Sequence, residues 1–127
     1  MTSFLIYYIE LLITGGNTYE LLQNLRNSGF DEKIIEFSKK DNTVVVGFSA
    51  GAIVLGTTLR LLEHSWSSWT KLRDENKVGI KDLRGLGIID KEIFPHYTKE
   101  DEKGLEEYMK KYNTEVITLK DDEFLMV

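Results

Sequence analysis

Apolar residues along the chain fall into short runs separated by polar or glycine-containing turns, and most of these runs have the composition of buried strands. Residues 5–13 form the first run, which is apolar on both faces, as in a central strand of a parallel sheet. Residues 43–46 form the clearest strand, because all four are β-branched. The same pattern predicts three further strands, at 85–89, 93–97 and 115–119.

Between these runs, more widely spaced apolar positions indicate helices. The first is capped by Asn17 or Thr18 and ended by Gly29, and Asp31 caps a second, short helix. Two further helices are predicted, with a long loop between them over 63–77: the helices at 50–62 and 98–111. This alternation indicates an α/β fold, a parallel sheet flanked by helices. Sites in such folds lie beyond the carboxyl ends of the strands.

The size and charge of the chain narrow the function classes. Residues 1–127 fit one domain, and the net charge of −5 argues against a nucleic-acid or anionic-membrane partner. The apolar N-terminal run is too short to span a bilayer and lacks the features of a signal peptide. With no cysteine and two distant histidines, we expect no disulfide, metal or cofactor, and a cytoplasmic location.

Residues 47–51 read Gly-Phe-Ser-Ala-Gly, the G-x-S-x-G pattern of a nucleophile elbow. A sharp turn between a strand and a helix would expose the hydroxyl of Ser49, and the two glycines would leave room for the close approach. A serine that only caps the helix is the structural alternative. The strand before Ser49 and the helix after it favour the nucleophile.

A serine nucleophile needs a neutral base within hydrogen-bond reach, usually a histidine. His96 follows a proline at a predicted strand end, whereas His64 lies where the preceding helix ends, so His96 is preferred. An acidic residue should orient the imidazole. The candidates between Ser49 and His96 are Glu63, Asp74, Glu75 and Asp82.

Gly15 and Gly16 form a glycine turn after the first strand. Such turns can bind phosphate through backbone N–H groups, but this one lacks the lysine of a P-loop and the glycine spacing of a dinucleotide site. An N–H donor for an oxyanion hole is a better use for Gly16, and an ordinary tight turn is the alternative.

Taken together, five blocks resemble the dipeptidase E (aspartyl dipeptidase) family of serine peptidases, which includes cyanophycinase. In order, the blocks are residues 15–19 (GGNTY), 29–31 (GFD), 47–53 (GFSAGAI), 85–90 (GLGIID) and 94–97 (FPHY). The resemblance runs over residues 12–124. It implies an α/β sandwich similar to the class I glutamine amidotransferases (flavodoxin-like), with serine as the nucleophile.

Carried over from that family, Ser49 is the nucleophile, His96 the base and Glu63 the acid, with Asp74 as second choice for the acid. The N–H groups of Gly16 and Ala50 would form the oxyanion hole. The implied substrate is a small peptide, with an N-terminal aspartate in dipeptidase members. Arg60 and Arg73 are candidates, by location alone, for binding the substrate carboxylate.

Compared with the family, the chain looks shortened at both ends. Missing strands would expose apolar faces, and a homodimer would cover them. The alternative to a peptidase is a catalytically inactive family member that serves as an assembly or binding subunit. An amidase or esterase on the same scaffold is a third hypothesis.

Overall fold

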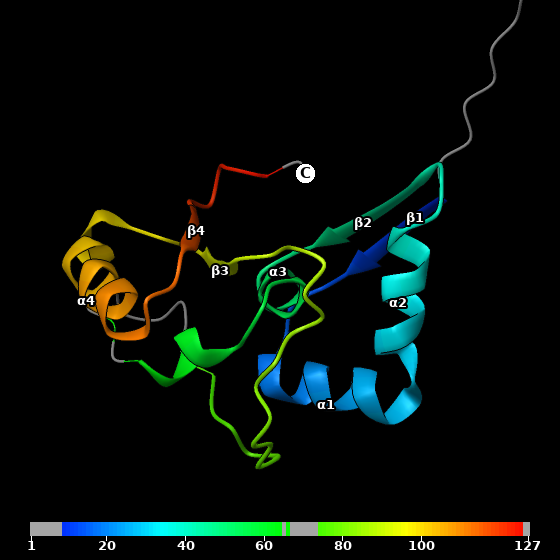
Figure 1. Ribbon diagram of the computed structural model, residues 1–127, viewed down its shortest axis with the longest axis horizontal. Helices are drawn as coiled ribbons and strands as arrows, with labels where there is room; N and C mark the ends of the chain where they lie inside the picture. Colours follow the sequence, from blue (N-terminus) through cyan, green and yellow to red (C-terminus); the bar gives the residue numbers. More distant parts are fainter. Residues whose placement is uncertain (1–8, 65, 67–73, 126–127) are drawn as a thin grey trace, which may run out of the picture.

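Two pairs of parallel strands form the framework of the molecule (Figure 1). A computed structural model describes residues 9–64, 66 and 74–125. Strand β1 (Ile9–Ile13) pairs with β2 (Thr43–Gly47), and β3 (Glu92–Pro95) pairs with β4 (Val116–Leu119). In the register of the two pairs, Ile9 lies opposite Thr43 and Glu92 opposite Val116.

Helical segments connect the strands of each pair, as parallel pairing requires. Helices α1 (Thr18–Ser28) and α2 (Phe30–Ser38) lead from β1 to β2. The short helix η2 (Lys99–Asp101) and helix α4 (Glu102–Tyr112) lead from β3 to β4. The parallel α/β architecture expected from the sequence is therefore present, as two separate two-stranded sheets within the described residues.

Helix α3 (Ala50–Leu55) lies between the two sheets (Figure 1). Ile53, Val54 and Leu55 are all buried, and the apolar core continues through them from one strand pair to the other. The other buried apolar side chains of this cluster are Ile13, Tyr19, Leu22, Ile34, Leu59, Leu61, Leu62, Phe94, Leu105 and Tyr108. The core is therefore continuous between the two strand pairs.

The start of α1 and the junction with α2 follow local rules. The Asn17 side chain accepts a hydrogen bond from the N–H of Glu20 over 3.0 Å, so Asn17 is the N-cap. Gly29 ends α1 in the left-handed region (φ 76°) and is also the N-cap of α2. Asp31 therefore lies in the first turn of α2, and the sequence prediction that it caps this helix is wrong.

The segment at 85–89 is not a strand, contrary to the prediction. Its N–H groups instead bond carbonyls at the end of α3: Leu86 donates to Val54 over 2.7 Å, and Ile89 donates to Leu55 over 3.0 Å. Gly85 allows this approach, because a Cβ there would lie 2.3 Å from the carbonyl oxygen of Gly56. An apolar glycine-punctuated segment can thus pack on a helix end instead of joining a sheet.

The helix predicted over 50–62 is also broken. Its backbone becomes extended at Gly56 (φ −80°, ψ −167°), and a short helix η1 (Arg60–Glu63) follows. Part of the loop predicted over 63–77, and residues 5–8 of the first predicted strand, lie outside the described residues. Across the part of the chain that the structure describes, no helix is both long and apolar enough to cross a membrane.

Candidate active site

Ser49 occupies a sharp turn between β2 and α3, with a positive φ of 53°. This conformation is uncommon for a residue other than glycine. The two flanking glycines make the turn sterically feasible. A Cβ on Gly51 would lie 2.3 Å from the carbonyl oxygen of Ile13, and one on Gly47 would lie 2.6 Å from the backbone of Gly51. The side chain of Ser49 makes no capping bond to α3, so its hydroxyl is not used as a helix cap.

His96 immediately follows β3 and also has a positive φ, of 59°. The next residue, Tyr97, donates its N–H to the carbonyl of Leu119 at the end of β4, over 3.0 Å. This arrangement directs the imidazole across to the other strand pair. Its Nε2 lies 3.0 Å from the Oγ of Ser49, within the range of a hydrogen bond.

The other ring nitrogen of His96 contacts Asp121. The Nδ1 of His96 lies 2.5 Å from Oδ1 of Asp121, the second residue after β4. Ser49, His96 and Asp121 therefore form a continuous serine–histidine–carboxylate chain. Each follows the carboxyl end of a different strand, where sites of parallel sheets are expected.

Sequence reasoning missed Asp121, which it assigned only to a polar turn. The four candidate acids lie between Ser49 and His96 in sequence, whereas Asp121 lies beyond His96. The strand pattern held a usable signal, because β4 was predicted correctly at its carboxyl end. The first carboxylate after that end is Asp121.

The four acids considered from the sequence make other contacts. Glu63 lies beside the hydroxyl of Tyr19, and burial, then this negative charge, raises the pKa of Tyr19 well above its usual range. Asp74 accepts from Thr18. The remaining two, Glu75 and Asp82, pair with Lys77 and Arg84. The expectation that Glu63 supports His96 is corrected, because Asp121 occupies that position.

The other histidine and one proposed specificity residue belong to an aromatic cluster. The ring of His64 contacts those of Trp66 and Tyr108, with centroids 4.6 and 5.4 Å apart. Arg60 donates to the buried carboxylate of Glu92 over 3.3 Å and stacks on Tyr112 at 4.0 Å. Arg60 is thus engaged in a structural network, and Arg73 lies outside the described residues.

The glycine turn lies against the nucleophile. A Cβ on Gly15 would be 3.6 Å from the Cβ of Ser49, an ordinary contact distance. Ala50 is the first residue of α3, where backbone N–H groups have no partner within the helix. Among the described residues, neither Gly16 nor Ala50 donates its N–H to another protein group. Within this part of the chain, both N–H groups therefore have no acceptor.

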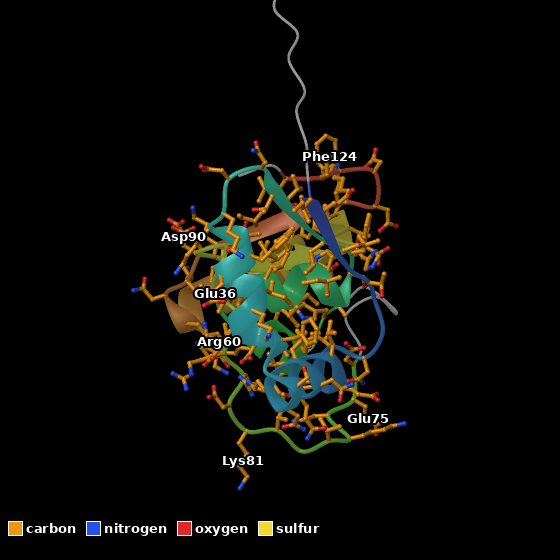
Figure 2. The ribbon with its side chains drawn as sticks, turned by 90° about the vertical axis from the view of Figure 1, so that its right-hand side faces the viewer. Glu36, Arg60, Glu75, Lys81, Asp90 and Phe124 are labelled. Atoms are coloured by element: carbon orange, nitrogen blue, oxygen red, sulfur yellow. The ribbon has the colours of Figure 1, made fainter. Side chains whose placement is uncertain are left out.

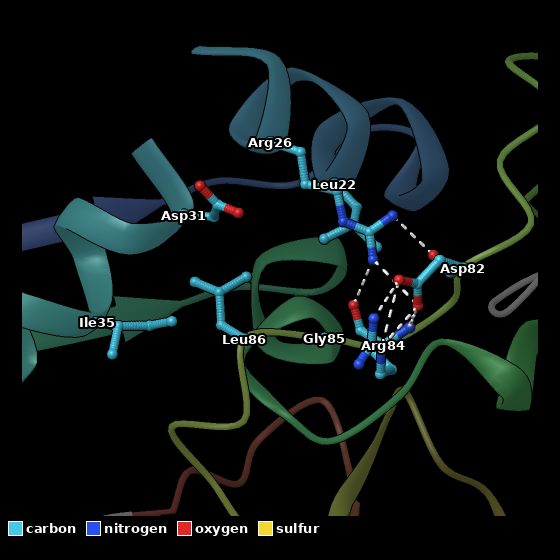
Figure 3. A pocket seen from close by; sticks show the side chains of 8 residues that line it. All are labelled: Leu22, Arg26, Asp31, Ile35, Asp82, Arg84, Gly85 and Leu86. Atoms are coloured by element: carbon cyan, nitrogen blue, oxygen red, sulfur yellow. Dashed lines mark hydrogen bonds and ion pairs between the residues drawn. The ribbon is translucent and has the colours of Figure 1, made fainter. Parts of the chain in front are cut away.

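A separate pocket of about 230 Å³ is lined by residues of α1, α2 and the segment at 82–86 (Figure 3). Its polar lining is already paired: Arg26 donates to the carbonyls of Asp82 and Arg84 over 2.7 and 2.8 Å, and Arg84 pairs with the Asp82 carboxylate. None of the serine–histidine–carboxylate residues lines it. Within the described ranges there is no group of three or more metal-binding side chains.

The family model described as peptidase family S51 matches residues 8–127. The chain belongs to peptidase family S51. This confirms the resemblance to the peptidase E and cyanophycinase group at the level of the family.

Relatives in two Listeria species support the assignment. The chain is 29% identical to the uncharacterized peptidase Lmo0363 of Listeria monocytogenes over 87 residues, 68% of this chain and 39% of that protein. It is 28% identical to the uncharacterized peptidase Lin0382 of Listeria innocua over 126 residues, 91% of this chain and 57% of that protein. The chain thus spans about half the length of these relatives.

A solved structure supports the fold. The crystal structure of a candidate peptidase E protein from Listeria monocytogenes EGD-e matches with a TM-score of 0.64 and 23% identity. The match covers 87% of this chain and 50% of that one. At this identity the match concerns the fold alone, and it agrees with the short parallel sheets and flanking helices described above.

Proposed function

We propose that this chain is a serine peptidase that hydrolyses small peptides. Ser49 is the nucleophile, His96 the general base and Asp121 the acid that orients the imidazole. One observation carries the proposal: His96 lies 3.0 Å from the Ser49 hydroxyl through Nε2 and 2.5 Å from the Asp121 carboxylate through Nδ1. Membership of a serine peptidase family agrees with this chemistry.

The proposed reaction has two halves, acylation and deacylation. As the Ser49 Oγ attacks the carbonyl carbon of the substrate, the Nε2 of His96 takes the hydroxyl proton. The imidazolium then returns this proton to the leaving amine, which separates as the peptide C–N bond breaks. A water molecule, deprotonated by His96 in the same way, then attacks the acyl-serine ester. The ester bond breaks, the carboxylic acid product leaves, and the Ser49 hydroxyl regains its proton. Asp121 stays ionised and stabilises the imidazolium formed in each half of the cycle.

The oxyanion of each tetrahedral intermediate needs donors that are already in place. The N–H groups of Gly16 and Ala50 are suited to this role, because neither bonds a protein acceptor within the described part of the chain and the two turns meet at Ser49. The N-terminal end of α3 adds the positive end of a short helix dipole.

Small acidic peptides, with an N-terminal aspartate, are the proposed substrate class, as in the dipeptidase branch of the family. Arg60 does not serve this preference, because it is bound to Glu92 and Tyr108. We also propose that the fold is a sandwich similar to the class I glutamine amidotransferases. The proposed location is the cytoplasm.

We also propose that the active form is a homodimer. Leu12, Val44 and Phe48 are exposed large apolar side chains on or beside the β1–β2 sheet. Phe124 is exposed as well, at the end of the molecule where it is labelled in Figure 2. Apolar surface of this kind is typical of an interface between chains. Sedimentation velocity tests this proposal, and a monomer at micromolar concentration would contradict it.

Activity is tested with a serine-directed phosphonate and a panel of dipeptides. We expect the wild-type chain to form one covalent adduct on Ser49, detected by mass spectrometry, and Ser49→Ala to lose both the adduct and hydrolysis. A wild-type chain without adduct and without hydrolysis would favour the inactive assembly subunit. Adduct formation with turnover of esters or simple amides only would favour an esterase or amidase.

A further inference from the structure

The residues that follow the glycine turn at Gly16 are hydrogen-bonded to the segment at 74–75, which is distant in sequence. The backbone N–H of Thr18 donates to Oδ2 of Asp74 over 2.7 Å, and the Thr18 hydroxyl donates to the same oxygen. The side chain of Asn17 donates to the backbone carbonyl of Glu75 over 2.9 Å. Thr18 is only 1% exposed, so Asp74 is the group that satisfies these donors away from water.

This attachment lies two residues from the proposed oxyanion donor. Gly16 has a φ of 133°, and, apart from its chain neighbours, no atom of the described residues lies within 4 Å of a Cβ built there. Glycine is also the residue with the widest backbone freedom. On the side where a Cβ would point, close packing therefore does not restrict this part of the turn. The nearest fixed points are Gly15, in contact with Ser49, and Thr18, held by Asp74.

We infer that Asp74 is a positioning residue for the oxyanion hole. By holding Thr18, its carboxylate keeps the Gly16 N–H directed at the carbonyl oxygen of the bound peptide. The inference rests on the proposed function of Ser49. It assigns to Asp74 a role different from that of triad acid, since His96 already has Asp121 as its partner.

The consequence is specific to the transition state. An oxyanion-hole donor strengthens its bond as negative charge develops on the carbonyl oxygen, so its loss lowers kcat more than it raises KM. A displacement of about 1 Å in a catalytic group can lower the rate about 100-fold. Asp74→Ala should therefore lower kcat about 10- to 100-fold and change KM by less than about two-fold.

Two variants separate positioning from a general loss of structure. Asp74→Asn retains an oxygen acceptor for Thr18 and should restore most of the kcat. Glu75→Ala is the matched control, because it removes the adjacent carboxylate, which pairs only with Lys77 among the described residues and projects at the surface (Figure 2). Its backbone carbonyl still accepts from Asn17, so this variant should keep the wild-type kcat.

A second readout does not depend on catalysis: the amide signal of Gly16 in heteronuclear NMR spectra reports the position of the turn. Asp74→Ala should shift or broaden this signal, while Asp74→Asn and Glu75→Ala leave it in place. If Asp74→Ala does not fold, Thr18→Val removes the hydroxyl donor alone and is compared in the same way. An unchanged kcat and Gly16 signal in a folded Asp74→Ala chain, or losses equal to those of Glu75→Ala, would overturn the inference.

The two proposals fail separately. If the wild-type chain neither hydrolyses peptides nor reacts with the phosphonate, the proposed function fails, and the Gly16 signal still decides whether Asp74 positions the turn. If the wild-type chain is active and Asp74→Ala has the same kcat, only the role of Asp74 is refuted.

Discussion

Replacing Asp121 by asparagine removes the charge beside His96 while keeping the size of the side chain. In the wild-type chain, Asp121 Oδ1 lies 2.5 Å from Nδ1 of His96, so the carboxylate faces the positive charge that develops on the ring. An amide at this position cannot stabilise the imidazolium in the same way. If its NH₂ group turns toward Nδ1, it also favours the wrong tautomer of the neutral ring.

The size of the effect depends on solvent exposure. Unit charges about 4 Å apart interact by about 1 kcal/mol in water and about 4 kcal/mol at the effective dielectric constant near a protein surface. The Asp121 side chain is 59% exposed and that of His96 34%, so water screens part of the attraction. We expect a loss of about 2–3 kcal/mol, which corresponds to a fall of about 30- to 150-fold in kcat.

The assay measures kcat and KM on an Asp-X dipeptide for Asp121→Asn and two comparison variants. Asp122→Asn changes the next carboxylate in the same turn and should leave kcat unchanged. Glu63→Gln tests the acid favoured by the sequence, and it should also leave kcat near the wild-type value, because Glu63 lies beside Tyr19. Wild-type kcat in Asp121→Asn together with a large loss in Glu63→Gln would refute the assignment of the acid.

Three further predictions follow from the strained turn and the buried polar groups. Ser49→Gly should abolish activity and give a chain about 1 kcal/mol more stable toward urea than Ser49→Ala, because only glycine adopts the φ of 53° without strain; equal stabilities would contradict the strain. Glu92→Ala should lower the free energy of unfolding by about 3–5 kcal/mol, since it leaves the Arg60 guanidinium and the Tyr108 hydroxyl without their buried acceptor; a loss below about 1 kcal/mol in urea titrations would show that the network is dispensable. Burial first, then neighbouring carboxylates, raises the pKa of Tyr19 and Tyr108 well above the usual value. Folding therefore favours the neutral form of both tyrosines. Their contribution to the free energy of unfolding should be complete below about pH 10 and should fall as the pH rises above it. Phenolate absorbance of these two residues should appear only with the loss of the far-ultraviolet circular dichroism signal, and early ionisation of both would contradict the prediction.

Much of this protein was predictable from local sequence. The G-x-S-x-G pattern between a valine-rich strand and a helix predicted the sharp turn at Ser49, because only glycine permits the close backbone contacts found at Gly47 and Gly51. The proline before His96 and the strand that ends there placed the histidine on the correct edge. The four strands of the described residues were also predicted, since β-branched and apolar runs are local signals.

Other features depended on contacts between distant residues. The segment at 85–89 has the composition of a strand, but its N–H groups bond backbone carbonyls at the end of α3. The helix predicted over 50–62 was broken at Gly56, whose backbone also approaches Gly85. Residue periodicity predicts neither the packing of 85–89 nor the break at Gly56, because both depend on contacts between residues that are distant in sequence.

The serine elbow and the histidine are what the sequence alone determined, since each depends on a few neighbouring residues and on the end of one strand. The carboxylate that lies beside His96 was decided by the tertiary structure. The parallel pairing of β3 with β4 brings Asp121 beside His96, although 25 positions separate them in sequence. Glu63 lies beside Tyr19 instead. Any carboxylate is chemically competent for the role, and only the register of the strands decides which one lies within hydrogen-bond distance.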